Sequence, residues 1–210
     1  MKKHIWINPV AAEKYKKIIS KIHRNLIDKG YTIVECNSQA EYIRNEYKKY
    51  SINRNSTILD CRCPKTIEIL NHNNLINKNM DIPSIDPILI STSKFLYDKY
   101  INDNESLLII TCPCTHIRDF GRKIFKDNQN IVFYTWKEFA ERENLNFHGE
   151  IKKSPIPLGF FKNEFNDILE ISGESEILKE IKKINNSNEI KYSLVEMLYC
   201  KDGCNNGDGI

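Results

Sequence analysis

The chain has 210 residues, with 31 Lys and Arg against 28 Asp and Glu and a formal net charge of +3 at pH 7. This length suits one large domain or two small lobes. The weak, dispersed charge gives little support for nucleic-acid binding, and no run approaches the ~20 apolar residues that span a bilayer. Basic residues follow Met1, but no apolar stretch typical of a secretory signal follows them. We therefore expect a cytoplasmic protein whose thiols stay reduced.

Short apolar runs alternate with stretches of helical spacing along most of the chain. Strands are predicted over residues 4–7, 31–36, 57–60, 107–111 and 131–134. Helices are predicted over residues 11–28, 38–50, 64–70, 87–102 and 136–143, the second capped by Ser38 and the last by Thr135. Residues 71–79 form an Asn-rich loop. Strands separated by helices favour an α/β fold with a mostly parallel sheet.

The pattern changes from about Lys152 onward. Residues 154–159 predict a proline-stiffened turn, residues 168–171 a short strand, and residues 173–184 a charged helix. We therefore expect two lobes, a larger α/β lobe over residues 1–150 that carries Cys63 and Cys114, and a smaller lobe over residues 151–210 that carries Cys200 and Cys204.

Six of the seven cysteines fall in three short groups, each near the end of an apolar run. The groups are Cys61 with Cys63, Cys112 with Cys114, and Cys200 with Cys204. Because ligands of parallel sheets lie beyond the carboxyl ends of the strands, these thiols can be delivered to one place. Considered by themselves, the residues leave three interpretations open: an iron–sulfur cluster, a structural zinc ion, or no metal.

Four segments, taken in order, resemble motifs of the H-cluster (catalytic) domain of the iron-only, or [FeFe], hydrogenases. They are residues 59–64 (Leu-Asp-Cys-Arg-Cys-Pro), 111–118 (Thr-Cys-Pro-Cys-Thr-His-Ile-Arg), 154–159 (Ser-Pro-Ile-Pro-Leu-Gly) and 195–209. The last segment has the pattern Glu-Met-x-x-Cys-x-x-x-Cys-x-x-Gly-x-Gly and is the most specific. The chain thus resembles a compact, divergent member of that family over nearly its whole length.

This resemblance implies two lobes with mostly parallel sheets flanked by helices and a 4Fe–4S cluster between them. Matched position by position, the cluster ligands are Cys63, Cys114, Cys200 and Cys204. In the family, the ligand at the position of Cys204 also bridges to a two-iron subsite. The resemblance further implies an anaerobic source and a redox partner such as a ferredoxin.

Several positions depart from the family pattern. Arg62 stands where the family has a proton-relaying cysteine, and Ile117 stands where it has a lysine that contacts the two-iron subsite. Asp208 replaces the second glycine of the tail, and Phe160 and Phe161 follow the Leu-Gly pair. These differences favour a protein that keeps the 4Fe–4S cluster but lacks the two-iron subsite. A compact true hydrogenase (2 H⁺ + 2 e⁻ to H₂) and a structural zinc protein are the alternatives.

Four further residues are candidates for chemistry beside the cluster: Cys61, Arg62, Cys112 and Arg118. Two arginines and spare thiols suit a small anionic or sulfur-containing ligand. Alternatively, the arginines pair with Asp60 and Asp119, and the thiols of Cys61 and Cys112 either have no chemical role or bind a second metal. If the chain is an enzyme, we expect an iron–sulfur oxidoreductase; otherwise, we expect a redox or sensor module.

Overall fold

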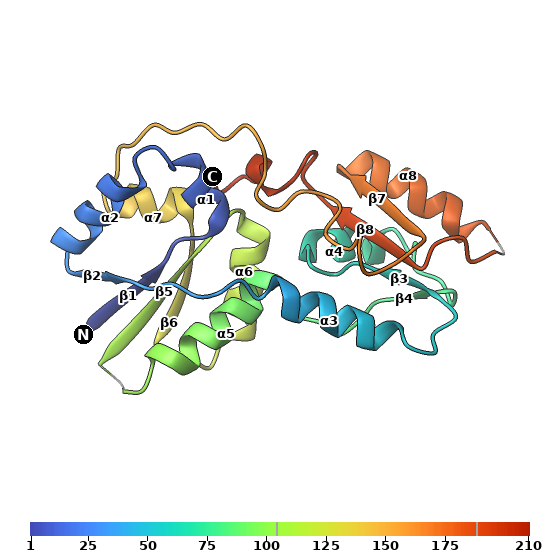
Figure 1. Ribbon diagram of the computed structural model, residues 1–210, viewed down its shortest axis with the longest axis horizontal. Helices are drawn as coiled ribbons and strands as arrows, with labels where there is room; N and C mark the ends of the chain where they lie inside the picture. The colour runs from blue at the N-terminus through green and yellow to red at the C-terminus, as the bar shows by residue number, and fades with distance from the viewer. Residues whose placement is uncertain (104, 188) are drawn as a thin grey trace. The chain divides into compact units, whose positions relative to one another are not determined.

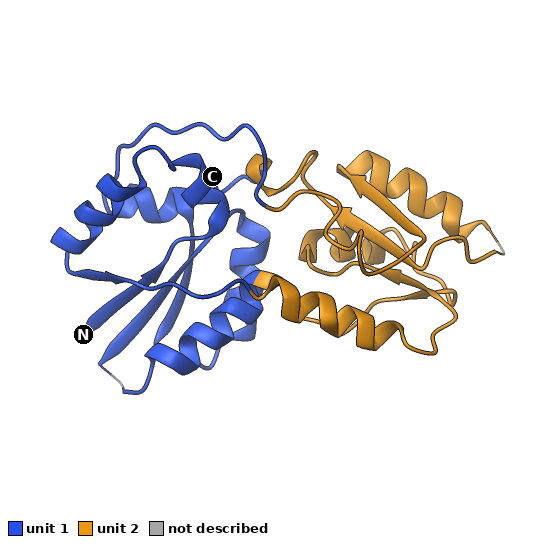
Figure 2. Cartoon of the chain, in the orientation of Figure 1, with its two compact units in different colours: residues 1–38, 89–155, 207–210 blue, residues 39–88, 156–206 orange. Residues whose placement is uncertain are grey.

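The structure is a computed structural model, and it describes residues 1–103, 105–187 and 189–210. The chain divides into two compact units, each built on a four-stranded sheet flanked by helices (Figures 1 and 2). Every strand pair among the described residues is parallel. This confirms the predicted α/β fold with parallel sheets. No helix in the described part of the chain is long and apolar enough to cross a membrane.

The two units are discontinuous in sequence, which differs from a single boundary near residue 150. Unit 1 comprises residues 1–38, 89–155 and 207–210, and unit 2 comprises residues 39–88 and 156–206 (Figure 2). The reason is a long-range strand pair: β3 (Thr57–Leu59) lies beside β8 (Leu194–Leu198). Unit 2 therefore carries three of the predicted cluster ligands, Cys63, Cys200 and Cys204, and unit 1 carries Cys114.

The sheet of unit 1 has the strand order β2–β1–β5–β6. Its strands are β1 (Lys2–Trp6), β2 (Tyr31–Ile33), β5 (Ser106–Cys112) and β6 (Ile131–Thr135). Its helices are α1 (Pro9–Lys14), α2 (Ile19–Asp28), α5 (Ile88–Tyr100), α6 (Thr115–Ile124) and α7 (Trp136–Arg142). Helices α5 and α6 cover one face of the sheet, and α1, α2 and α7 cover the other (Figure 1).

The central strand β5 is buried along almost its whole length, as expected where helices cover both faces of a parallel sheet. Thr135 caps α7 in a reciprocal arrangement with Glu138, which confirms the predicted cap. The predicted helix over residues 11–28 is instead two helices, α1 and α2, separated by a turn at residues 15–18, where the Tyr15 ring lies 5.5 Å from that of Trp136. Helix α6 was not predicted.

Unit 2 has the strand order β4–β3–β8–β7. Besides β3 and β8, its strands are β4 (Met80–Asp81) and β7 (Ile168–Ser172). Its helices are α3 (Ala40–Ser51), α4 (Pro64–His72) and α8 (Glu174–Asn185), with a short 3₁₀ helix at Cys204–Asn206. Neighbouring residues of one strand point to opposite faces. Accordingly, Leu59 packs in the core with α4 and α8, and Ile58 packs in the core with α3.

Candidate functional site

Two of the predicted ligands stand at the first turn of a helix. Cys63 is the N-cap of α4, and Cys114 is the N-cap of α6. Helix N-termini present unpaired N–H groups and a partial positive charge, and both favour a thiolate. Burial raises the pKa of the Cys63 thiol, whereas the backbone N–H groups of Tyr199, Thr66 and Lys65 lower it. The Cys63 sulfur thus lies among backbone donors.

Cys200 and Cys204 follow strand β8 in a tight turn. Because β3 and β8 are parallel neighbours, their carboxyl ends lie at the same edge of the unit 2 sheet. Tyr199 directly precedes Cys200, and a hydrogen bond from its backbone N–H lowers the pKa of the Cys63 thiol. The segment that leads to Cys200 therefore lies next to Cys63. In the turn, Asp202 and Gly203 have φ values of 62° and 114°. The unit 2 structure therefore brings the Cys63 and Cys200 segments together.

Among the described residues, no group of three or more His, Cys, Asp and Glu side chains is arranged to hold a single metal ion. None of the seven cysteines, all of which the structure describes, forms a disulfide. The chemistry of the donors fits an iron–sulfur cluster, since thiolates are its usual ligands and backbone N–H groups near the sulfur stabilise it. Cys36, the seventh cysteine, is half-buried, and its thiol donates to the Asn37 carbonyl at 2.8 Å.

Arg62 is buried in a triad with two carboxylates. Its Nε donates to the two oxygens of Asp60 at 3.0 and 3.1 Å, and its Nη2 donates to Asp60 at 2.7 Å and to Glu196 at 2.8 Å. Both carboxylate residues are 0% exposed. The guanidinium also lies 3.9 Å from the ring centroid of Phe160 and 4.6 Å from that of Phe161. The pairing of Arg62 with Asp60 is confirmed, and Glu196 is an additional partner.

Glu196 has a second role that the sequence analysis missed. Its carboxylate accepts the N–H groups of Gly159 and Phe160, each at 3.1 Å. It therefore joins β8 to the turn that follows the Pro-Leu-Gly segment of unit 2. Burial raises the pKa of the Glu196 carboxyl, and the Arg62 charge acts against that rise. A charged residue inside an apolar run could have indicated that Glu196 has a buried partner, but it does not identify which residue that partner is.

Cys61 is enclosed by hydrogen bonds. Its sulfur lies 3.1 Å from the Tyr47 hydroxyl and donates to the carbonyl oxygens of Pro83 and Ile85 at 3.2 and 3.3 Å. Tyr47 is itself 0% exposed, and its hydroxyl donates to Asp60 at 3.1 Å. Burial raises the pKa of the Cys61 thiol. This environment favours the neutral thiol, which is a poor nucleophile.

Cys112 and Arg118 lie in unit 1. Cys112 is 0% exposed in the core beneath α5 and α6, and burial raises its pKa well above the ordinary value for a thiol. Arg118 donates to Asp119 at 2.8 and 3.0 Å and also pairs with Glu138. The predicted pairing of Arg118 with Asp119 is therefore confirmed. Both candidate arginines already have carboxylate partners.

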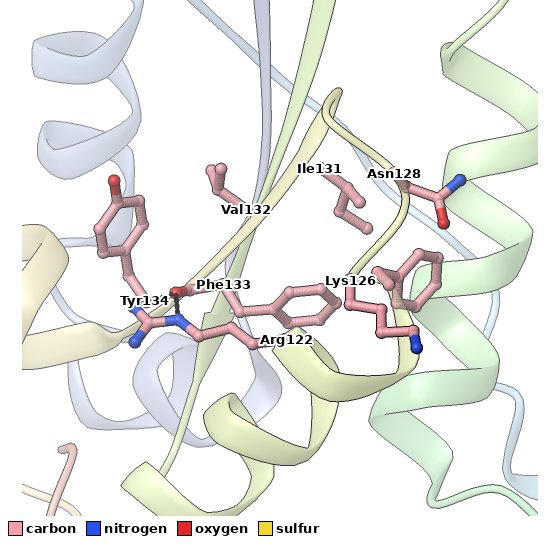
Figure 3. A pocket seen from close by; sticks show the side chains of 8 residues that line it. Arg122, Lys126, Asn128, Ile131, Val132, Phe133 and Tyr134 are labelled. Atoms are coloured by element: carbon pink, nitrogen blue, oxygen red, sulfur yellow. Dashed lines mark hydrogen bonds between the residues drawn. The ribbon is translucent and has the colours of Figure 1, made fainter.

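An open pocket of about 240 Å³ lies in unit 1 between the end of α6 and strand β6 (Figure 3). Arg122 extends along it and donates to the Phe133 carbonyl at 3.1 and 2.8 Å. Because β6 is the edge strand of its sheet, Arg122 occupies a backbone acceptor that another strand could otherwise use. None of the predicted site residues lines this pocket.

No protein-family model matches the chain, and no curated protein matches it. Among solved structures, it is similar to a variant of the [FeFe]-hydrogenase HydA1 from Chlamydomonas reinhardtii. The two share 11% sequence identity, the TM-score is 0.57, and the match covers 99% of this chain and 79% of the other. At this identity the likeness concerns the fold alone. The chain has a hydrogenase-like fold.

Proposed function

We propose that this protein binds a 4Fe–4S cluster through the thiolates of Cys63, Cys114, Cys200 and Cys204, and that it serves as a redox or sensor module. The order of the cysteine motifs and the hydrogenase-like fold support this proposal. When bound, such a cluster supplies one-electron transfer. A small electron carrier such as a ferredoxin is a partner that suits the redox role.

The arrangement of Cys63 carries the proposal. Its sulfur stands at the start of α4, among the N–H groups of Tyr199, Thr66 and Lys65, and beside the segment that leads to Cys200. These donors stabilise a thiolate, and the Cys63 residue is partly buried. A zinc tetrathiolate instead requires its sulfurs to lie within about 4 Å of one another. The described residues of unit 2 contain no such compact group, whereas a cubane spreads its ligands over four irons.

Replacing the ligands one at a time tests this assignment. In protein reconstituted with iron and sulfide under anaerobic conditions, we expect Cys63→Ser, Cys114→Ser, Cys200→Ser and Cys204→Ser each to lower the bound iron roughly tenfold or more. Cys36→Ser is the matched control and should retain the broad visible absorption. Retention of the cluster in any of the four ligand variants would remove that residue from the ligand set.

We further propose that the two-iron subsite is absent. The Arg62 guanidinium pairs with Asp60 and Glu196, and the Ile117 side chain is buried in the unit 1 core, so neither supplies a proton relay or an anchoring charge. Protein matured with the hydrogenase accessory enzymes should show no infrared bands from iron-bound CO or cyanide. It should also release no H₂ from reduced viologen. Either signal would restore the compact-hydrogenase alternative.

Chemistry on a small anionic or sulfur-containing ligand at Cys61, Arg62, Cys112 and Arg118 stays a prediction. The ion pairs of both arginines and the burial of Cys112 favour structural roles for these residues. We therefore expect Cys61→Ser and Cys112→Ser to retain the cluster. A loss of iron in either variant would instead identify an additional ligand.

A further inference from the structure

Residues 207–210 pack into unit 1 against the starts of α6 and α7. The N–H of Gly209 donates to the Pro113 carbonyl at 3.1 Å, and the Gly209 carbonyl accepts the N–H of Lys137 at 3.1 Å. A Cβ added at Gly209 would lie 2.7 Å from the Cβ of Thr135 and 3.0 Å from the Pro113 carbonyl oxygen. This close approach of two backbones requires glycine.

Asp208 caps α6 from outside the helix. One carboxylate oxygen accepts the backbone N–H of Thr115 at 2.9 Å, and the other accepts the Thr115 hydroxyl at 2.6 Å. Lys137 Nζ donates to the Asp208 carbonyl at 3.0 Å and so fixes the backbone beside it. Thr115 is the first residue of α6, and the N-cap residue Cys114 makes no side-chain capping bond of its own. A carboxylate 93 residues away thus accepts the first of the N–H groups of α6 that have no partner within the helix.

We propose that Asp208 is a positioning residue for Cys114: it holds the first turn of α6 in one conformation, and its charge lowers the reduction potential of the bound cluster. This inference rests on the cluster binding proposed above. Asp208 holds both the backbone N–H and the hydroxyl of Thr115, the residue directly after Cys114, and so fixes the backbone that carries the Cys114 sulfur. A fixed negative charge disfavours the addition of an electron nearby.

Two substitutions separate the capping effect from the charge effect. Asp208→Asn keeps an oxygen that can accept the Thr115 N–H but removes the charge. We expect it to retain the cluster and to shift the ratio of reduced to oxidised cluster toward reduction by up to about tenfold, or about 59 mV for one electron. Asp208→Ala removes both the accepting oxygen and the charge, and it should also speed the loss of iron to a chelator several-fold. Asp127→Asn, an exposed aspartate beyond the other end of α6, is the charge-matched control and should change neither quantity.

Amide hydrogen exchange of Thr115 in the cluster-free protein gives a readout independent of iron. We expect slow exchange in the unmodified protein and in Asp208→Asn, and exchange at least about tenfold faster in Asp208→Ala. An equal rate of Thr115 amide exchange in all three proteins would overturn the proposal that Asp208 caps α6. A cluster whose potential in Asp208→Asn matches that in Asp127→Asn would overturn the charge effect while leaving the proposed function intact. Failure of the unmodified protein to bind iron would instead overturn the proposed function, and this inference with it.

Discussion

Replacing Arg62 by methionine is expected to lower the free energy of unfolding of the cluster-free protein by about 3–5 kcal/mol. The substitution leaves the carboxylates of Asp60 and Glu196, both 0% exposed, in the interior of unit 2 without a cation. Methionine retains an unbranched apolar side chain, so much of the packing against Phe160 and Phe161 can persist. Urea denaturation followed by far-UV circular dichroism under reducing conditions measures the loss.

Arg54→Met is the matched control, because Arg54 has the same kinds of partner at the surface of the same unit. It pairs with Asp81 at 3.0 Å and stacks on Tyr50 at 3.8 Å, but its side chain is 40% exposed. An exposed pair of this kind contributes about 0–1 kcal/mol. An equal loss in the free energy of unfolding for Arg62→Met and Arg54→Met would contradict the claim that the burial of the Arg62 ion pairs makes its replacement costly. Fluorescence of the two tryptophans, both of which lie in unit 1, should change little in either variant.

The loss in the free energy of unfolding caused by Arg62→Met is expected to be smaller at acidic pH. Burial raises the pKa of the Glu196 carboxyl, and removing Arg62 removes a charge that opposes the rise. A raised pKa in the folded state means that the folded variant binds this proton more readily than the unfolded chain does. Its stability therefore falls as the pH rises from the ordinary value for glutamate through the raised one. The difference in the free energy of unfolding between the variant and the unmodified protein should be larger at about pH 7.5 than at about pH 5. A difference that does not change with pH would indicate that the variant loses packing alone.

Phe161→Ala is the second substitution with a large expected effect, a loss of about 3–5 kcal/mol in the free energy of unfolding. Phe161 is 0% exposed, and its ring centroid lies 4.6 Å from that of Tyr47 and 4.8 Å from that of Phe160. The truncation leaves a cavity next to the buried triad. Phe95→Ala, at a side chain that is 45% exposed, should cost no more than about 0.5 kcal/mol. Similar losses in the two variants, measured by the same denaturation, would contradict the assigned core.

The parallel α/β fold could be predicted from the sequence because apolar strands and helical spacing alternate along it. The cap at Thr135 was equally visible, since Glu138 stands at the position that a capping box requires. Helix α6 was missed, although Ile117, Phe120 and Ile124 recur at helical spacing among charged residues. Strand β4 has two residues, too few to show any period.

The division into units could not be predicted, because it depends on the pairing of β3 with β8 across more than half of the chain. The same limit applies to the site. Arg62 and Asp60 are two residues apart, and their pairing was among the expected alternatives. Glu196 is 134 residues from Arg62, and Asp208 is 93 residues from Thr115, so nothing local in the sequence announces either contact.

The content of iron, acid-labile sulfide and zinc in protein purified without oxygen tests cluster binding most directly. We expect about four irons and about four sulfides per chain, with no stoichiometric zinc, because a cubane with four thiolate ligands has this composition. The iron should leave with the sulfide when the cluster is oxidised. Zinc at one ion per chain, or a protein that contains neither metal, would contradict the account.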